Sequence, residues 1–219
     1  MSESAPQPLT DDPVQVEVVG TETPFTGRVW NIRRDAFVYN GETIVREYVD
    51  HTGAVAVLAM DEHDRVLLIK QYRHPVRARD WEIPAGLLDI AGEDALAAAQ
   101  RELAEEADLT ASRWDVLSDF YTSPGGSDEA IRVYLARDLA PAAEVFARGE
   151  EEADIEVRWA SLDEVVDAVL ARRVQNPSLA IGALAAHAAR ARGWATLAPG
   201  DAPWPQRPRP LGETPGRDA

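Results

Sequence analysis

The sequence predicts an α+β fold, and three observations support this class. Short runs of apolar or alternating residues, separated by turn residues, fill most of the chain between residues 13 and 160 and are typical of β-strands. Helical spacing of apolar residues is confined to about 93–107, 161–171 and the region after 176. With 219 residues, 45% of them hydrophobic, the chain is long enough for one domain with a small appendage.

The N-terminal part is expected to form an antiparallel β subdomain over residues 13–50. Residues 1–12 are polar and contain proline, which predicts disorder. The stretch VQVEVV alternates as a strand does, and residues 28–51 read as two strands joined at Asn40-Gly41, which is a strong hairpin signal. Because three strands are too few to bury both faces of a sheet, we expect this N-terminal subdomain to need a partner.

A second, larger domain is predicted over residues 51–194. Its first strand, GAVAVLAM (53–60), is almost continuously apolar, as in a strand buried on both faces. The strand RVLLIKQYR follows, then a loop AGLLDIAG, a helix over about 93–107, and the strands WDVLSDFY, AIRVYLARDL and IEVRW. The segment Ser161-Leu-Asp-Glu164 is a capping box that begins a helix, and Asn176-Pro177-Ser178 begins the last one.

Residues 195–219 contain prolines every few positions and are expected to be a flexible tail, which Trp204 could anchor. No apolar run is long enough to span a membrane, and the N-terminus has no features of a signal peptide. The absence of cysteine excludes disulfides and thiolate sites and fits a cytoplasmic protein. A net charge of −16 argues against binding nucleic acid or an anionic membrane surface.

Four carboxylates crowd the segment RELAEEADL, residues 101–109, at the end of the predicted 93–107 helix. Glu105 and Glu106 lie three and four positions after Glu102, so the three side chains share one side of the helix and repel one another. A solvated acidic face is the simpler interpretation, because glutamate favours helices. The alternative is a site for divalent cations, for which clustered carboxylates are suitable ligands.

The residues around this helix favour the cation site. A glycine-bearing turn, a glutamate, seven residues and then Arg-Glu-Leu-Ala-Glu-Glu form a long and restrictive pattern, which resembles the signature of the Nudix hydrolase family. The matching residues are Gly86, Glu93, Arg101, Glu102, Leu103, Glu105, Glu106 and Leu109. Six residues rather than five separate Gly86 from Glu93, and Asp108 stands where the signature has its last glycine. The resemblance implies a Nudix fold, with mixed β-sheets sandwiched between helices.

The resemblance also implies the metal ligands. They would be Glu102 and Glu106, helped by Glu105 and the backbone carbonyl of Ala85, and they would bind two or more Mg²⁺ or Mn²⁺ ions. Arg101 would orient these carboxylates, and Glu93 would brace the turn between loop and helix. Metal ions held in this way polarise a pyrophosphate and activate water.

The segment outside the signature resembles the ADP-ribose pyrophosphatase subgroup. Pro124 lies sixteen residues after Asp108, and the stretches REYVDHTGAVAV, QYRHPVR and WEIPAGLLD are similar as well. The implied reaction is Mg²⁺-dependent hydrolysis of ADP-ribose to AMP and ribose 5-phosphate. The alternatives are the same chemistry on another sugar nucleotide or dinucleotide, and a catalytically silent module that senses ADP-ribose.

The remaining site residues are also carried over from this resemblance. In the acidic segment ARGEEEAD, Glu152 would activate the attacking water, with Glu151 as its rival. Arg46 and Arg73 would meet the phosphates. Glu82 would contact the terminal ribose, or it is a charge at a strand edge. Trp30 would stack on the adenine, or it packs between the N-terminal strands. The subgroup forms domain-swapped homodimers, so Arg46 could serve the site of the partner subunit.

Overall fold

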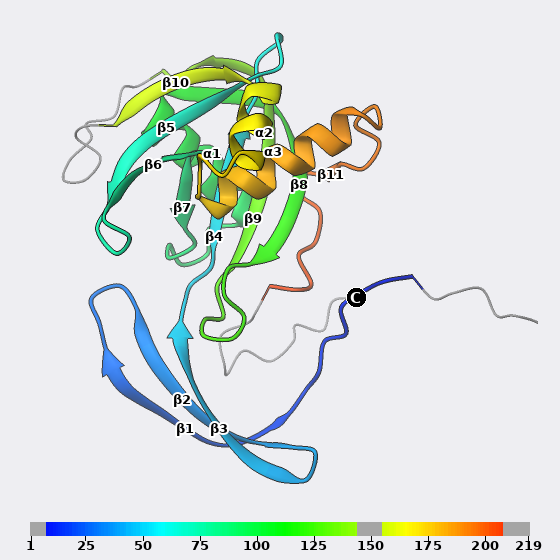
Figure 1. Ribbon diagram of the computed structural model, residues 1–219. Coiled ribbons are helices and arrows are strands. Elements are labelled where there is room, and N and C mark those ends of the chain that lie inside the picture. The colour runs from blue at the N-terminus through cyan, green and yellow to red at the C-terminus, as the bar shows by residue number, and fades with distance from the viewer. Residues whose placement is uncertain (1–7, 144–154, 208–219) are drawn as a thin grey trace, which may run out of the picture. The chain divides into compact units, whose positions relative to one another are not determined.

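The computed structural model describes residues 8–143 and 155–207, and the chain divides into two compact units, Met1–Asp50 and His51–Ala219. Figure 1 shows both units, each with its own sheets. No helix in these two ranges is long and apolar enough to cross a membrane.

The first unit is one antiparallel sheet in the order β1-β2-β3. Its strands are β1 (Glu17–Thr26), β2 (Asn31–Tyr39) and β3 (Glu42–Asp50). The predicted hairpin is confirmed, because Tyr39 pairs with Glu42 across a two-residue turn in which Asn40 and Gly41 have φ of 52° and 80°. Positive φ at both positions is what a type I′ turn requires. The first strand begins three residues later than the alternating segment VQVEVV suggested.

This sheet has no hydrophobic core in its described part. Every residue of β1 is exposed, and the one buried side chain of the three strands is the charged Asp35. Its carboxylate accepts hydrogen bonds from Thr21 Oγ1 at 2.8 Å and Tyr48 Oη at 2.9 Å. Large apolar residues such as Phe25 and Val45 remain 60% and 50% exposed.

The second unit contains two sheets. The larger has the order β11-β8-β9-β4-β7, and the smaller has the order β10-β5-β6. Their strands are β4 (Ala54–Ala59), β5 (Arg65–Arg73), β6 (Ala78–Glu82), β7 (Ala85–Leu87), β8 (Leu109–Tyr121), β9 (Ala130–Pro141), β10 (Glu156–Ser161) and β11 (Ala198–Pro199). Among the described strands, only β4 and β9 pair in parallel, so the larger sheet is mixed.

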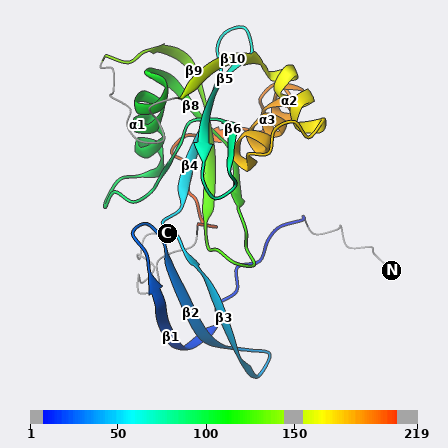
Figure 2. The same cartoon turned by 60° about the vertical axis from the view of Figure 1, so that its left-hand side comes forward.

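Helices cover both sides of these strands, as Figure 2 shows for α1 (Ala95–Ala107) on one side and α2 (Leu162–Leu170) with α3 (Pro177–Arg190) on the other. Strand β4 explains the arrangement, because all six of its residues are buried. Ala56 and Leu58 pack in the cluster that contains Leu179 of α3, whereas Val55 and Val57 pack in the cluster that contains Leu103 of α1. The predicted strand with two buried faces is therefore confirmed, as is the sandwich of mixed sheets between helices.

Two segments differ from the sequence-based expectation. Residues 85–87, expected within a loop, form the edge strand β7, and residues 78–82 form β6. In addition, residues 198–207, expected within a flexible tail, lie against the second unit. Ala198 and Pro199 pair with β8, and the Trp204 ring lies 4.8 Å from the Arg132 guanidinium. Proline density predicts the lack of a regular helix or sheet, but it does not exclude a fixed path along a surface.

Candidate active site

The edge strand β7 presents a backbone group to helix α1. On the two sides of β7, Val57 N donates a hydrogen bond to Pro84 O and Leu88 N donates one to Gly53 O. The backbone groups of Pro84, Gly86 and Leu88 therefore face β4. Because backbone groups alternate in direction along a strand, the N–H and C=O of Ala85 point to the outer edge of the sheet. There the Ala85 N–H donates to Glu106 Oε2 at 2.9 Å. The carbonyl of Ala85 points to the same side.

Gly86 lets the next turn of α1 approach the same strand. A Cβ at this position would lie 1.9 Å from both the carboxyl carbon and Oε1 of Glu102. A side chain there would require the end of the Glu102 side chain to move, so the Glu102 carboxylate takes its present position directly on the backbone of β7 because residue 86 is glycine. Glu106 is 5% exposed and lies one turn further along the helix. The two carboxylates thus meet at Ala85-Gly86.

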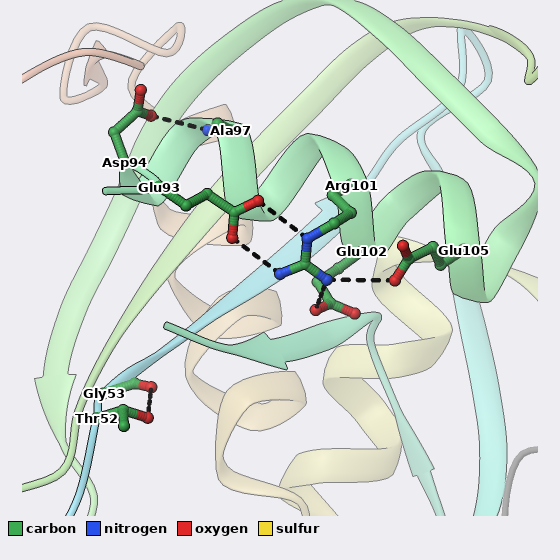
Figure 3. Close-up of polar contacts among 8 residues, drawn as sticks. All are labelled: Thr52, Gly53, Glu93, Asp94, Ala97, Arg101, Glu102 and Glu105. Atoms are coloured by element: carbon green, nitrogen blue, oxygen red, sulfur yellow. Dashed lines mark hydrogen bonds and ion pairs between the residues drawn. The ribbon is translucent and has the colours of Figure 1, made fainter. Parts of the chain in front are cut away.

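Arg101 holds three glutamates in place, as Figure 3 shows. Its Nε and one terminal nitrogen donate to the two oxygens of Glu93 at 3.0 and 2.9 Å. The other terminal nitrogen donates to Glu102 Oε1 at 2.5 Å and to Glu105 Oε2 at 3.2 Å. The pKa of Arg101 is raised, mainly because of its hydrogen bonds with Glu93. The same hydrogen bonds lower the pKa of Glu93. One guanidinium therefore reduces the repulsion among these acidic groups.

The donor set suits a hard divalent cation. It consists of glutamate carboxylates and the Ala85 carbonyl, and oxygen ligands are those that Mg²⁺ and Mn²⁺ prefer. Within the described ranges no group of three or more histidine or acidic side chains is already arranged as a metal site. The fit rests instead on two carboxylates and one backbone oxygen converging on Ala85-Gly86.

Arg73 and Glu82 form a second polar cluster next to this turn. Two nitrogens of Arg73 donate to the two oxygens of Glu82, both at 2.8 Å, and the Glu82 side chain is only 3% exposed. The hydrogen bonds with Glu82 are the main cause that raises the pKa of Arg73, and the charge of Glu106 also contributes. Because the charge of Glu106 acts on Arg73, the pair lies near this carboxylate of α1.

Gln71 belongs to this cluster and was missed by the sequence reasoning. Its Nε2 donates to Glu82 Oε2 at 3.4 Å, and the residue is 2% exposed. Alternation along β5 could have indicated it, because residues two apart on a strand share a face, and Arg73 was already a candidate.

The other predicted residues lie in three different places. Pro124 is exposed in the loop between β8 and β9. Trp30 and Arg46 belong to the first unit, Trp30 before β2 and Arg46 on β3. Glu151 and Glu152 lie outside the described residues.

Both departures from the Nudix signature are absorbed locally. Asp108 ends α1 in the left-handed conformation, with φ of 53°, and its N–H donates to Ala104 O at 3.1 Å. Aspartate tolerates this conformation better than most residues with a side chain. The additional residue before Glu93 lies in a turn closed by the hydrogen bond from Glu93 N to Ile90 O, where Gly92 has φ of 82°.

The fold and the glutamate helix define the class of protein, and a family comparison agrees with them. Residues 50–180 match the NUDIX domain, so the chain belongs to the Nudix hydrolase family. A protein with the description "ADP compounds hydrolase" has a similar fold, with a TM-score of 0.64 over 84% of this chain and 99% of that chain at 20% identity.

Among curated relatives, the chain is similar to two bacterial proteins named as ADP-ribose pyrophosphatases and to a hydrolase with another substrate. It is 44% identical to an ADP-ribose pyrophosphatase of Mycobacterium tuberculosis over 88% of this chain and 92% of that protein. It is 36% identical to an ADP-ribose pyrophosphatase of Bacillus subtilis over 76% of this chain and 90% of that protein. A hydrolase of Streptomyces rubellomurinus that acts on a CMP-linked phosphonate is 30% identical over 69% of this chain and 71% of that protein.

Proposed function

We propose that the protein hydrolyses the pyrophosphate bond of ADP-ribose in the presence of Mg²⁺, giving AMP and ribose 5-phosphate. The observation that carries the substrate is the 44% identity to an ADP-ribose pyrophosphatase across 88% of the chain. The chemistry is supported by the convergence of Glu102 and Glu106 on Ala85-Gly86. Two or more Mg²⁺ ions, with Mn²⁺ as the other candidate, would be held by Glu102, Glu105, Glu106 and the Ala85 carbonyl.

Bound ions would polarise the pyrophosphate and lower the pKa of a water molecule. The protein contributes the arrangement of the charges. Arg101 orients Glu102 and Glu105 through its hydrogen bonds, and its positive charge reduces the repulsion between the two carboxylates. Glu93 occupies the far side of the same guanidinium and so prevents Arg101 from turning away.

The nucleotide contacts are proposed from the resemblance together with the Arg73–Glu82 pair. Glu82 holds Arg73 through two parallel hydrogen bonds, which restricts the guanidinium beside the carboxylates of α1. Arg73 can then meet a phosphate, while Glu82 can accept a hydrogen bond from a ribose hydroxyl. Pro124 would contact the substrate from the loop that joins β8 and β9, and Trp30 and Arg46 would contribute from the N-terminal sheet.

We also propose that the protein is a cytoplasmic homodimer and that Arg46 completes the site of the partner subunit. The sheet of the first unit supports the dimer, because its described residues bury no apolar side chain while Phe25 and Val45 stay exposed. Such a sheet gains stability when a second copy covers it.

The decisive experiment incubates the protein with Mg²⁺ and separate nucleotides, namely ADP-ribose, other ADP-sugars, a dinucleotide and a CMP-linked compound. The nucleoside monophosphate and the second product of each substrate, which are AMP and ribose 5-phosphate for ADP-ribose, are measured by chromatography. We expect the highest kcat/KM with ADP-ribose. Glu106→Gln should lower turnover by about two or more orders of magnitude, because removing an ionised ligand weakens metal binding without removing an acceptor for the Ala85 N–H. Glu62→Gln is the matched control, since the Glu62 side chain is 86% exposed.

A second candidate substrate is favoured by one relative. The hydrolase of Streptomyces rubellomurinus acts on a CMP-linked compound, so preference for cytidine over adenine in the panel would support that class. Tight binding of ADP-ribose without any hydrolysis would instead identify a sensing module, and full activity of Glu106→Gln would contradict the metal site.

A further inference from the structure

The C-terminal strap, which we define as residues 198–207, follows a fixed path along the second unit and appears in orange-red in Figure 1. It begins as β11, where Ala198 and Pro199 pair with Val116 and Asp115 of β8. Gly200 then passes so close to β8 that a Cβ there would lie 3.0 Å from the Trp114 carbonyl oxygen. The strap is therefore packed against the sheet.

A buried arginine anchors the middle of the strap. Arg132 on β9 is 3% exposed, and it donates two hydrogen bonds of 2.8 Å to the carboxylate of Asp119 on β8. The same guanidinium donates to the carbonyls of Ala202 at 2.6 Å and Pro203 at 3.1 Å. A buried guanidinium requires partners for its N–H groups, and the strap supplies two of them.

The end of the strap contacts the start of the loop that carries Pro124 and the segment before β4. The Tyr121 hydroxyl, at the end of β8, donates to the Gln206 carbonyl at 2.7 Å. Arg207 donates to the Thr52 carbonyl at 3.1 Å, and Thr52 lies in the segment that leads into β4. These two contacts connect the strap to the end of β8 and to the segment that leads into β4.

The loop itself is tied to the segment that contains Thr52. Glu129 accepts a hydrogen bond from Thr122 Oγ1 at 2.6 Å, and its other oxygen lies 3.1 Å from His51 Nε2. The backbone N–H of His51 donates to Asp128 Oδ1 at 2.8 Å. The contacts therefore form a closed ring. It runs from Thr52 through the strap to Tyr121. From there it follows the loop to Glu129 and returns through His51 to Thr52.

We propose that the C-terminal strap positions the loop of residues 122–129 for substrate binding, with Tyr121 and Arg207 as its positioning residues. The inference rests on the proposed function in one respect, namely that Pro124 contacts the nucleotide. Neither Tyr121 nor Arg207 needs to touch the substrate. Each acts by restricting the loop before binding, so that less conformational entropy is lost when the substrate arrives.

The test uses the full chain with Tyr121→Phe, Arg207→Gln and the double variant. Each substitution removes one hydrogen bond to the strap while it keeps most of the side chain, and Tyr121 is 41% exposed, so the fold should persist. We expect the double variant to raise KM for ADP-ribose by about five- to tenfold, which corresponds to about 1.0–1.4 kcal/mol and is of the size expected when hydrogen bonds are lost. The value of kcat should change by less than about twofold, as expected for lost binding contacts. The amide hydrogens of Gly126 and Ser127 should exchange faster with solvent than in the wild type. Arg207→Lys, which keeps a donor, should raise KM less than Arg207→Gln does.

Arg190→Gln is the matched control, because Arg190 is also a partly exposed arginine that forms ion pairs, with Asp64 and Asp163, but lies on α3. An unchanged KM together with unchanged exchange in the loop would overturn the inference, as would an equal rise of KM in the Arg190 control. If the wild-type protein does not hydrolyse ADP-ribose, the proposed function fails separately, and the exchange of Gly126 and Ser127 still decides whether the strap orders the loop.

Discussion

At position 86 there is no space for a methyl group. The Glu102 carboxylate would meet a Cβ at 1.9 Å, and this carboxylate is held between the strand and Arg101. We predict that Gly86→Ala displaces Glu102 and lowers kcat/KM by about 10²-fold, because a shift of about 1 Å in a positioned group can have that effect. The measurement is steady-state hydrolysis at several Mg²⁺ concentrations.

Gly20→Ala provides the control for this glycine substitution. A Cβ at Gly20 would meet nothing closer than 3.9 Å, so only the general effect of adding a methyl group remains. Wild-type activity in Gly86→Ala would show that Glu102 does not need its position on β7.

A second prediction at the residue scale concerns the general base. The resemblance assigns this role to Glu152, which lies outside the described residues. Glu152→Gln should lower kcat by about 10²–10⁴-fold with little change in KM, because it removes the basic oxygen and leaves the positioning contacts in place. If Glu151→Gln shows this loss and Glu152→Gln does not, the neighbouring glutamate is the base. If neither variant slows the enzyme, the water is activated elsewhere.

At the scale of the elements, the junction before β4 should make stability depend on pH. Burial lowers the pKa of His51 below its ordinary value of 6.5, although the charges of Glu129 and Asp128 oppose this shift. The ring is neutral in the folded protein, where its Nδ1 accepts a hydrogen bond from Gly53 N at 2.9 Å. As the pH falls through 6.5, the unfolded chain therefore binds a proton that the folded chain does not bind.

We accordingly predict that the free energy of unfolding decreases between about pH 7.5 and 5.5, by at most about 1.4 kcal/mol per pH unit from this group. Thermal unfolding at several pH values measures this change in the free energy of unfolding. His51→Gln should flatten this part of the profile, whereas substitution of His63, whose side chain is 68% exposed, should leave it unchanged. Equal profiles for the wild type and His51→Gln would contradict the assignment.

At the scale of the whole molecule, the N-terminal sheet predicts self-association. Phe25 and Val45 lie on one face, because they pair with Ile32 and Ala36, which are four residues apart on β2. We expect a species of about 48 kDa by light scattering, twice the chain mass of 24.0 kDa.

The double variant Phe25→Glu/Val45→Glu should dissociate this dimer, since charges on an apolar interface are costly to bury. If Arg46 completes the site of the partner, activity should fall as the dimer dissociates and should recover at high protein concentration. A monomer with full activity would refute the shared site.

The sequence by itself determined the class of fold and the clustering of carboxylates along one helix. Continuous apolarity identified β4 as a strand with two buried faces, Asn40-Gly41 identified the hairpin, and the spacing of Glu102, Glu105 and Glu106 placed them on one side of α1. These features depend on residues a few positions apart, so a local pattern is sufficient to predict them.

Only the tertiary structure decided how distant segments meet. Residues 85–87 become a strand because β4 offers them a partner, and their register then directs Ala85 towards Glu106. The proline-rich segment 198–207 is ordered because a buried Arg132 needs carbonyl acceptors, which Ala202 and Pro203 provide. In each case the stabilising contact joins residues about 20 to 70 positions apart, and no local pattern specifies which distant group will satisfy a buried donor.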